Sequence, residues 1–388
     1  MELSIQRNTL LAGVQKTLGV VEKRTTLPIL NNVLIRTKGD KVRIVATDRE
    51  ISLIADYDAN VMVEGDITLS ARKLYEMIRE IQGDMIYLKK DEHNTVTITC
   101  GKDGKTIYKI LGVPADDFPN IGDDIAVELF RIKGSALIEL IRKTFPAMST
   151  DEMKRDLSGV FFKAGLEKDG SACVAKMVAT DGFRLAVSCV GIEVCPDEGR
   201  EVEFCGLDKG IIIPRKGVVE IRRLIETASN IITDDVMMGV QGGMCVIKTN
   251  NATLKVSLVN AGYPDYHRVI PVDMGDVVCF NKDTVLHALK RMNVVSTEGC
   301  DGVIIKLVKN GMMMSSSNPD VGEANEDVEV SYNGEEIEVG YNVNFLIDAM
   351  EVIDEEKVTF DVGVGVRPGI IKALDNDNYV CAVMPMRF

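Results

Sequence analysis

The stretch Val45-Ala46-Thr47-Asp48 decides the fold of this chain, because it returns further on as Val178-Ala179-Thr180-Asp181. Ser317-Asn318 stands at the corresponding place in a third segment, at a similar interval after Asp181. Both intervals are several times longer than the roughly 20–50 residues of a solenoid repeat. We therefore expect three copies of one whole domain. Domains in series with like ends form an arc, and an arc can close into a ring.

Two further sets of phrases keep a similar spacing. Ala71-Arg72-Lys73 opens an apolar, helix-like run, and Pro214-Arg215-Lys216 opens another at a comparable interval. Near the end of each copy a strand-like run is followed by a proline phrase; the three phrases are Asp117-Phe118-Pro119, Tyr263-Pro264-Asp265-Tyr266 and Met384-Pro385-Met386. The copies should therefore share their internal order of elements.

Each copy is expected to contain a strand, a helix and three strands, and then the same series again. Apolar residues recur at helical spacing in the expected helices and alternate with polar residues in the expected strands. The helices are expected at Arg7–Val21, Ala71–Ile81 with Ser70 as N-cap, Gly134–Phe145, Gly217–Ala228, Asp283–Val294 and Val343–Ile353. The strands of the first copy are expected at Leu3–Ile5, Val33–Thr37, Lys41–Ala46, Ile51–Tyr57, Asp66–Leu69, Met85–Lys89, Thr95–Cys100 and Thr106–Val113.

These patterns predict an α+β fold of three tandem domains, each made of two β-α-β-β-β halves. We expect the domains to span residues 1–126, 127–272 and 273–388. The middle domain carries extra length around Glu193–Gly210, which we interpret as a surface insertion.

Composition limits the cellular setting. The sequence shows no signal peptide and no apolar run near the ~20 residues of a membrane span, so no membrane partner is expected. The nine cysteines are scattered without a C-x-x-C pair, which favours reduced thiols in a cytoplasmic protein.

Charge is unevenly distributed along the chain, whose formal net charge is −14. The expected helices, with their flanking residues, span Arg7–Arg24, Ala71–Ile81, Lys133–Phe145, Arg215–Glu226, Lys282–Met292 and Val343–Ile353. These ranges hold 17 Lys and Arg against nine Asp and Glu, a net +8, which leaves −22 on the rest. Basic residues also decorate ordinary solvated helix faces. Against so acidic a remainder, however, an electropositive helical surface for phosphates is the favoured interpretation. The sixth helix is acidic and departs from this pattern.

The sequence offers no plausible catalytic constellation. Ser70-Ala71-Arg72-Lys73 matches S-x-x-K, but a serine N-cap before a basic helix explains it better, and the partner motifs of that enzyme class are missing. His93, His267 and His287 lie far apart without metal-ligand spacing. We expect no metal, no cofactor and no enzymatic activity.

Five phrases are specific enough to indicate a family. They are Thr26–Asn32 (TLPILNN), Val178–Ala186 (VATDGFRLA), Ile213–Val218 (IPRKGV), Tyr263–Pro271 (YPDYHRVIP) and Val383–Phe388 (VMPMRF). In these phrases, their order and their spacing, the chain resembles the bacterial DNA polymerase III beta subunit, the DNA sliding clamp, over its full length.

The resemblance implies a head-to-tail homodimer in which two three-domain arcs close a ring, with helices lining the hole and sheets outside. Such a ring encircles double-stranded DNA without reading its sequence and confers processivity on the replicative polymerase by topology. The charge segregation fits this arrangement, since phosphate contacts carry no sequence information.

The resemblance also implies a pocket between the central and C-terminal domains that binds short peptide motifs of the polymerase, the clamp loader and repair proteins. The matching positions are Leu157, Thr180, Gly182, Phe183, Arg184, Leu185, Pro264, Arg268, Val269, Val383, Met384, Pro385, Met386 and Arg387. Apolar side chains would form the slot, methionines would give an adaptable wall, and arginines would fix polar groups at the rim. Phe183 stands where relatives more often have a polar residue, which makes the rim more apolar.

Contacts with DNA and with the second subunit carry over less completely. Arg24 matches a DNA-contacting arginine of the family. Lys154 and Arg155 lie where well-known members present tyrosines, so they offer phosphate attraction without base stacking. The basic helix starts complete the expected DNA-binding set, Arg24, Arg72, Lys73, Lys154, Arg155, Arg215 and Lys216. The subunit contact aligns with Tyr108 and Ile110 at one end and Val294 and Val295 at the other.

An alternative from another class stays open. The acidic sixth helix and the missing tyrosines are also compatible with a monomeric peptide-binding scaffold that kept the pocket and lost the ring. An enzyme is a distant third hypothesis, which would require a paired nucleophile and base.

Overall fold

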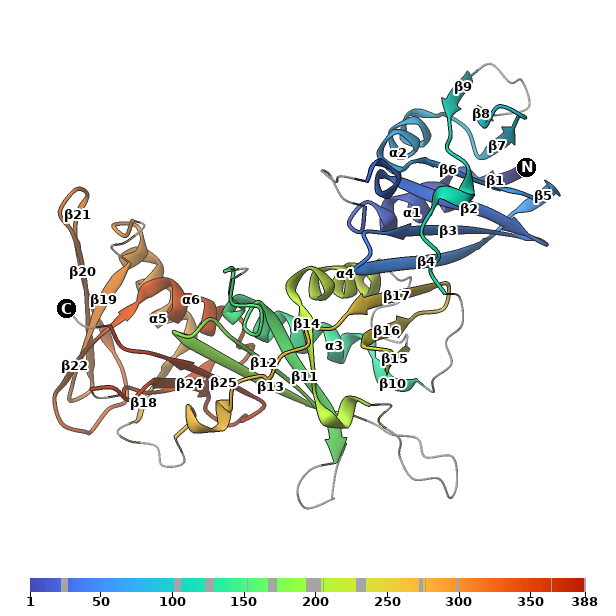
Figure 1. The fold of residues 1–388 in the computed structure, drawn as a ribbon. Coiled ribbons are helices and arrows are strands. Elements are labelled where there is room, and N and C mark those ends of the chain that lie inside the picture. The colour runs from blue at the N-terminus through green and yellow to red at the C-terminus, as the bar shows by residue number, and fades with distance from the viewer. Residues whose placement is uncertain are drawn as a thin grey trace. The chain divides into compact units, whose positions relative to one another are not determined.

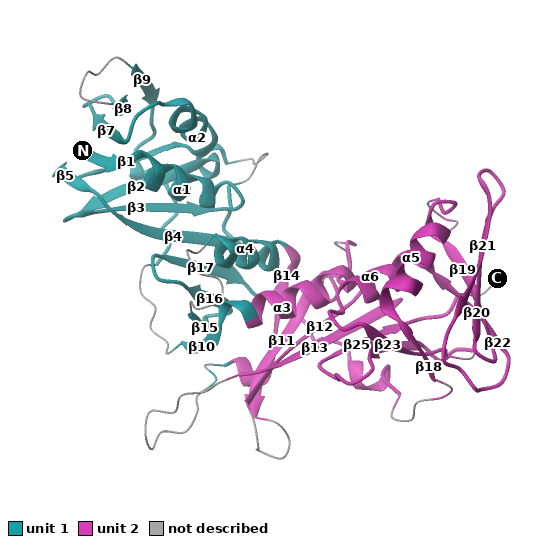
Figure 2. Ribbon diagram, turned by 180° about the vertical axis from the view of Figure 1, so that it is seen from behind, with its two compact units in different colours: residues 1–135, 201–206, 216–258 teal, residues 136–200, 207–215, 259–388 magenta. Residues whose placement is uncertain are grey.

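The structure is a computed structural model that describes residues 1–21, 27–100, 106–122, 129–151, 153–166, 173–192, 204, 206–227, 235–271, 275, 277–297, 299, 301–363 and 365–386. The chain forms two compact units (Figure 2). Unit 1 comprises Met1–Ser135, Glu201–Gly206 and Lys216–Leu258, and unit 2 comprises Ala136–Arg200, Leu207–Arg215 and Val259–Phe388.

The first copy of the repeat has the expected order with one addition (Figure 1). Its elements are β1 (Glu2–Gln6), α1 (Arg7–Thr17), β2 (Asn32–Lys38), β3 (Lys41–Thr47), β4 (Ile51–Asp58), β5 (Asn60–Val63), β6 (Asp66–Ser70), α2 (Ala71–Glu80), β7 (Met85–Lys90), β8 (Thr95–Cys100) and β9 (Thr106–Leu111). The short strand β5, which pairs with β1, was not anticipated.

The second and third copies are each two β-α-β-β-β halves, as expected. The second contains β10 (Phe130–Lys133), α3 (Gly134–Thr144), β11 (Gly159–Leu166), β12 (Cys173–Thr180), β13 (Arg184–Gly191), β14 (Ile211–Pro214), α4 (Arg215–Glu226), β15 (Asp235–Gln241), β16 (Met244–Lys248) and β17 (Ala252–Ser257). The third contains β18 (Val277–Asn281), α5 (Lys282–Asn293), β19 (Gly302–Val308), β20 (Gly311–Asn318), β21 (Gly322–Glu329), β22 (Ile337–Asn342), α6 (Val343–Glu351), β23 (Lys357–Asp361), β24 (Gly369–Ala373) and β25 (Tyr379–Val383). Short 3-10 helices are Pro28–Asn31, Ala115–Asp117, Phe145–Ala147, Leu207–Lys209 and Tyr266–Arg268.

Two expectations change in detail. Ser70 is the N-cap residue of α2, as expected, but its side chain makes no capping hydrogen bond. The segment interpreted as a surface insertion is partly buried, because Leu207 lies in the core and Phe204 packs against Phe130 with ring centroids 5.5 Å apart. The expected boundaries at 126–127 and 272–273 fall outside the described residues, as do residues 193–203 of the insertion.

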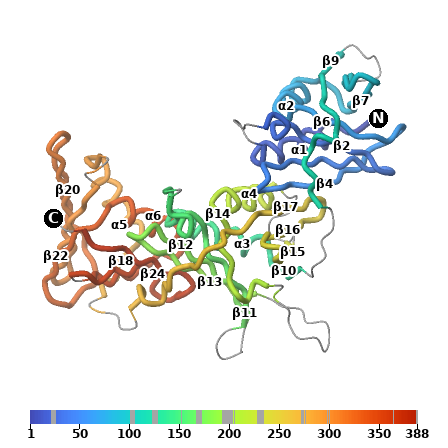
Figure 3. Tube along the Cα trace, viewed as in Figure 1, coloured from blue at the N-terminus to red at the C-terminus, as the bar shows by residue number. Residues whose placement is uncertain are grey.

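The sheets join neighbouring copies. An eight-stranded sheet of unit 1 has the order β10-β15-β16-β17-β4-β3-β2-β6, and one of unit 2 has the order β14-β11-β12-β13-β25-β24-β23-β18. Strand β17 of the second copy therefore lies beside β4 of the first (Figures 1 and 3). Strand β25 of the third copy lies beside β13 of the second (Figure 1). The remaining sheets, β5-β1-β7-β8-β9 and β21-β20-β19-β22, leave β9 and β21 at open edges.

The three copies can be aligned residue by residue from their strand pairing. In each copy, the residue before the second helix pairs with the first residue of the strand that follows the first helix. These strands are β2, β11 and β19. These pairs are Ser70 with Asn32, Pro214 with Gly159, and Asn342 with Gly302. The alignment makes Thr47, Thr180 and Ser317 equivalent, because continuing the pairing of β2 with β3, β11 with β12 and β19 with β20 by two residues sets each opposite that strand residue.

The end of each copy provides a second check. Two residues before Ser70, Pro214 and Asn342, a backbone carbonyl accepts a hydrogen bond from the closing segment of the same copy. The bonds run from Val113 N to Thr68 O (3.0 Å), from Val259 N to Ile212 O (3.0 Å) and from Met386 N to Gly340 O (2.8 Å). Met386 is therefore the counterpart of Val113 and Val259, so the terminal proline phrase is not aligned with Phe118-Pro119 as its sequence implied.

Candidate functional site

The repeated Thr-Asp phrase forms the same hydrogen-bonded turn in the first two copies. Thr47 Oγ1 donates to Ile51 O at 3.0 Å, and Asp48 Oδ1 accepts from Ile51 N at 2.6 Å. Thr180 Oγ1 donates to Arg184 O at 2.6 Å, and Asp181 Oδ1 accepts from Arg184 N at 3.0 Å. A hydroxyl and a carboxylate at this spacing satisfy the backbone of a tight turn.

Each of these turns is tied to a helix of the following copy. In unit 1 the buried carboxylate of Asp48 forms an ion pair with Lys216, the second residue of α4. In unit 2 the Arg184 guanidinium, 11% exposed, binds Asp181 Oδ2 at 3.1 Å and Asp348 Oδ2 of α6 at 2.6 Å. It also donates to Pro146 O at 2.5 Å and stacks over Phe345. Arg184 therefore positions the junction, and only its remaining donors are left for a ligand at the rim.

An apolar surface adjoins the turn of unit 2. Its buried floor consists of Val178, Leu185, Val187, Ile370 and Ala382, with Phe161, Cys189, Tyr263, Tyr266, Ile270 and Val380 packed against it. Tyr263 stacks on Phe161 with centroids 5.2 Å apart and donates from its hydroxyl to Val178 O at 3.3 Å. The segment that holds Pro264, Arg268 and Val269 is thereby anchored to the sheet.

The end of the chain borders the same surface. Met384 N donates to Phe183 O at 2.8 Å, and the Met384 and Met386 side chains are 36% and 39% exposed. The expected pocket residues Leu185 and Val383 are buried, so they support the surface from below. Phe183 is 61% exposed, and the Lys154 ammonium lies 5.8 Å from the centroid of its ring. The structure thus brings an expected DNA-binding lysine to the expected peptide site.

The remaining pocket residues have different surroundings. Leu157 is half-buried below the turn that contains Lys154. Arg268 is exposed and paired with Asp265 at 3.0 Å. Gly182 supplies the positive φ of the turn, and Pro264, Val269 and Pro385 reach the surface. Arg387 lies outside the described residues.

The junction between the first and second copies differs from that between the second and third at the positions equivalent to Leu185 and Ala382. Leu185 pairs with Ala382 across β13 and β25, whereas the equivalent pair across β4 and β17 is Ser52 with Lys255. The Lys255 side chain is buried and donates to Gly122 O, so an amine covers what is apolar floor in unit 2. Strand pairing, which the sequence pattern did not supply, shows that Leu185 and Ala382 are neighbours.

The expected DNA-binding residues fall into two groups. Arg72, Lys73, Lys154 and Arg155 are exposed, with Lys73 paired to Glu76 at 2.9 Å. Arg215 and Lys216 are engaged by other groups. Arg215 stacks on Phe145 and donates to Met148 O at 3.3 Å within the second copy, and Lys216 binds Asp48 of the first copy. Arg24 lies outside the described residues.

The expected subunit-contact residues lie near the two open strand edges. Tyr108 and Ile110 belong to β9, and Val294 and Val295 follow α5. Leu111 and Val321, which sequence reasoning did not single out, are 76% and 54% exposed, at the end of β9 and just before β21. Their signal was an unexplained large apolar residue at the end of a strand.

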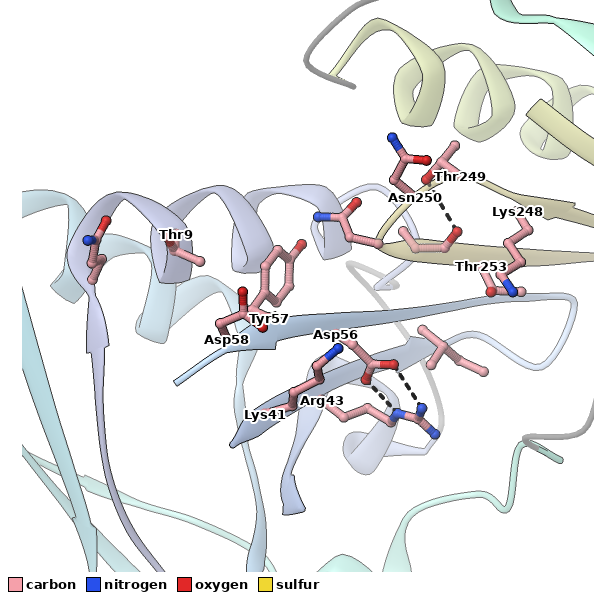
Figure 4. Close-up of a pocket in the computed structure, with 14 residues that line it drawn as sticks. Thr9, Lys41, Arg43, Asp56, Tyr57, Asp58, Lys248, Thr249, Asn250 and Thr253 are labelled. Carbon is pink, nitrogen blue, oxygen red and sulfur yellow. Dashed lines mark hydrogen bonds and ion pairs between the residues drawn. The ribbon is translucent and has the colours of Figure 1, made fainter. Parts of the chain in front are cut away.

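A polar pocket of about 750 Å³ opens in unit 1 beside the end of β4 (Figure 4). Arg43 binds Asp56 through two hydrogen bonds of 2.7 and 2.8 Å there. Burial, with a smaller effect of Asp56, raises the pKa of Tyr57 to about 12, so its phenol stays protonated at neutral pH. The pocket shows no nucleophile paired with a base among its lining residues.

The described residues define a class of protein, a scaffold of repeated α+β domains whose notable surfaces are strand edges and an apolar junction. Among them no group of three or more His, Cys, Asp or Glu side chains is placed to hold a metal ion. Within the same residues, no helix is long and apolar enough to cross a membrane.

Comparisons with known proteins identify the family. Models of the N-terminal, central and C-terminal domains of the DNA polymerase III beta subunit match residues 1–122, 131–265 and 267–387. The beta sliding clamp of Pseudomonas aeruginosa is 32% identical over 390 residues, with 100% of both chains covered. A crystal structure of the DNA polymerase III subunit beta from that species has a TM-score of 0.88 at 30% identity, again covering 100% of both chains. A Caulobacter crescentus beta sliding clamp, with polyethylene glycol in the region proposed for beta-motif tethering, has a TM-score of 0.89 at 29% identity and covers 100% of this chain and 99% of that one.

The chain therefore belongs to the DNA polymerase III beta subunit family, the sliding clamps of DNA replication. The sliding-clamp role predicted from the sequence is confirmed, and so is its non-catalytic nature as a processivity factor.

Proposed function

We propose that two copies of this chain close head to tail into a ring around duplex DNA. The observation that carries this proposal is the repeated junction. Within the chain, the last strand of one copy pairs antiparallel with β4 or β13 of the preceding copy. The third pair of this kind is β9 with β21, and both of these strands have an open edge. Pairing β21 with β9 of a second chain repeats the junction and uses both edges.

The internal alignment supports one register for this contact. Glu323 pairs with Ser317 as Ser52 pairs with Thr47 and Leu185 with Thr180, so these three are equivalent. Lys109 precedes Val113 by the same four residues that separate Lys255 from Val259 and Ala382 from Met386. Because Ser52 faces Lys255 and Leu185 faces Ala382, we infer that Glu323 faces Lys109 of the second chain.

Chemistry supports this register. Lys109 and Glu323 carry opposite charges, which stabilise a directly cross-strand pair. Two residues further on, Leu111 faces Val321, and this contact would bury the two exposed apolar side chains. The hydrogen bonds Ser257 N to Glu50 O and Met384 N to Phe183 O, both 2.8 Å, occupy the equivalent place at the inner junctions. Leu111 N to Val321 O is their counterpart.

A charge exchange tests the ring. Lys109→Glu places two glutamates opposite each other at both contacts of the dimer. At about 0.7 kcal/mol per contact, the dissociation constant should rise about tenfold. Adding Glu323→Lys reverses the pair and should restore the wild-type value. Sedimentation equilibrium measures the mass against the 42.6 kDa chain.

A strict monomer at micromolar concentration would favour the monomeric scaffold and overturn the ring. Encirclement needs a second assay, in which the protein is loaded onto nicked circular DNA by a clamp loader checked with its own clamp. Protein retained in high salt until the circle is cut is held by topology. Protein that stays after cutting is held by affinity, which contradicts sliding.

We further propose that partner proteins dock short linear peptides on the apolar surface of unit 2. At the position of Leu185 and Ala382, this junction is the one of the three whose cross-strand pair is apolar. The other two have Ser52 with Lys255 and, in the proposed ring, Glu323 with Lys109. At this position, apolar chemistry that matches a peptide with hydrophobic anchors is found at the junction between the central and C-terminal copies.

The methionines at its border provide the test. Met384→Ala with Met386→Ala should weaken a peptide carrying the polymerase's clamp-binding motif by a few kcal/mol, the effect of losing buried hot-spot side chains. Fluorescence polarisation measures the affinity. Met62→Ala with Met313→Ala is the matched control, because these methionines are 49% and 44% exposed on other sheets. Equal affinity of the two double variants would remove the docking assignment.

A further inference from the structure

The polar pocket of unit 1 beside the end of β4 belongs to none of the surfaces assigned above (Figure 4). Strand β17 begins at Ala252, opposite Ala55, so β4 runs on to Asp58 beyond the start of its neighbour. The turn between β16 and β17 and the start of α1 border the space beside this end of the strand. Its volume of about 750 Å³ is typical of sites for small molecules.

Tyr57 is the lining residue that packing explains least. Its equivalents in the other two copies are Val190 and Val328, by the register of β4, β13 and β21. Gly13 of α1 makes room for the ring, because a β-carbon there would lie 2.8 Å from Tyr57 Cε2. The hydroxyl has no such explanation, since it is buried and has no hydrogen-bond partner among the described residues. A buried hydroxyl without a partner lowers stability, and valine at this position avoids that cost.

A ligand seated in the pocket can supply the missing partner. Burial raises the pKa of Tyr57 to about 12, so the phenol is a hydrogen-bond donor at neutral pH. The hydroxyl is shielded from bulk water, but the exposed side chains of Gln6 and Asn251 line the same pocket. Exposed side chains change rotamer within nanoseconds, so these can move aside for an oxygen that accepts from Tyr57.

The rest of the lining interleaves donors with acceptors. Arg43 and Asp56 form a pair with hydrogen bonds of 2.7 and 2.8 Å, and their charges cancel. Lys41 and Asp58 face each other across β3 and β4 and add one charge of each sign. Among the lining residues this leaves one further charge, on the exposed Lys248. The turn between β16 and β17 adds amides and hydroxyls, from Thr249, Asn250, Asn251 and Thr253.

A ligand that matches this lining donates and accepts at adjacent positions and carries little net charge. A hydroxyl group does both, whereas an ionised carboxylate or phosphate only accepts and would face the two aspartates. Among the described lining residues, Ile54 and Ala252 are the aliphatic ones, too few to bury a hydrophobic ligand. We propose that this pocket binds a neutral sugar or polyol, one hydroxyl of which accepts a hydrogen bond from Tyr57. The pocket lies within unit 1, so the site does not depend on the proposed ring.

Tyr57→Phe tests the site, because it removes the hydroxyl and keeps the ring against Gly13. Saturation-transfer NMR with glucose, trehalose and glycerol measures saturable binding directly, free of the general stabilisation that excluded sugars produce. At least one of the three should bind, and Tyr57→Phe should raise its dissociation constant about fivefold, the effect of losing one hydrogen bond. Asn250→Ala should weaken the same probe. Tyr87→Phe is the matched control, because Tyr87 lies on β7 outside the lining and is 38% exposed.

A second measurement checks the premise about the hydroxyl. Without sugar, Tyr57→Phe should melt at or above the wild-type temperature, because it removes an unpaired buried group. A lower melting temperature would show that the hydroxyl already has a partner within the protein, and would overturn the inference. Binding of none of the three probes, or equal affinity of wild type and Tyr57→Phe, would also overturn it. Tighter binding of glucose 6-phosphate than of glucose would show an anion site formed by the lysines instead.

Discussion

Gly182 is the residue on which the turn beside the apolar surface depends. It has φ of +96°, and the equivalent Arg49 has φ of +80° at the same place in the first copy. The side-chain bonds of the Thr-Asp phrase close both turns, and the third position must then adopt a left-handed conformation. Glycine adopts that conformation without the steric cost that other residues meet.

We predict that Gly182→Ala lowers the free energy of unfolding by about 1 kcal/mol. A β-carbon at Gly182 would meet no atom within 4 Å, so the backbone alone carries the cost. Urea denaturation measures the change. Gly165→Ala is the control. A β-carbon at Gly165 would also meet no atom within 4 Å, and the φ of Gly165 is not positive. An equal loss in both variants would show that φ is not the cause.

The sequence allowed the turn phrase to be recognised, but not the burial of the residues around it. Threonine and aspartate at fixed spacing are local signals. The burial of Leu185 and Val383, and the engagement of Arg184 by Asp348, depend on strands and helices that are distant from one another along the chain. Those pairings are set by the whole sheet, so sequence reasoning placed Arg184 at an open rim.

At the scale of elements, most helices and strands followed from periodicity. The addition was β5, a strand of four residues with mostly exposed side chains, too short for an alternating pattern to reveal. Helix ends were predicted less well than helix centres. Ser70 precedes α2 without capping it, whereas Asn342 caps α6 through its side-chain oxygen, which accepts from Asn344 N at 2.9 Å and Phe345 N at 3.3 Å.

We therefore predict that alanine substitution lowers stability at Asn342 and has little effect at Ser70, the equivalent position in the first copy. Asn342→Ala should cost about 1 kcal/mol of stability, because two backbone N–H groups lose their acceptor. Ser70→Ala should cost little, and Asn342→Asp should retain the wild-type value because aspartate also caps. Thermal unfolding followed by circular dichroism compares the three. A cost for Ser70→Ala as large as that for Asn342→Ala would contradict the role given to the Asn342 side chain.

At the scale of the whole molecule, three sequence copies fold as two compact units, because the sheets cross from one copy to the next. The repeat and the family could be recognised from the sequence, since both rest on short phrases at long intervals. The strand order at the junctions could not, because a repeat shows which segments are equivalent and leaves open which of them pair. That strand order carries the proposal for the ring.

The ring contact differs from the two inner junctions in the turn that faces the next helix. Asp48 of the first copy binds Lys216, the second residue of α4. At the proposed ring contact, Asn318 of one chain is the equivalent of Asp48. Arg72 of the other chain, the second residue of α2, is the equivalent of Lys216. The Asn318 amide donates to Thr297 Oγ1 at 2.7 Å instead of presenting a charge. A neutral turn leaves this junction without the ion pair of the first.

We predict that Asn318→Asp tightens the dimer, because the new carboxylate can bind Arg72 of the second chain and can accept a hydrogen bond from Thr297. With about 1 kcal/mol gained at each of two contacts, the dissociation constant should fall at least tenfold. Dilution followed by size-exclusion chromatography measures it. Adding Arg72→Gln should abolish the gain, while Arg72→Gln alone should change the wild-type dimer little. A gain that survives Arg72→Gln would show that this turn does not face α2 of the second chain. A dimer that Asn318→Asp weakens both with Arg72 and with Arg72→Gln would show the same.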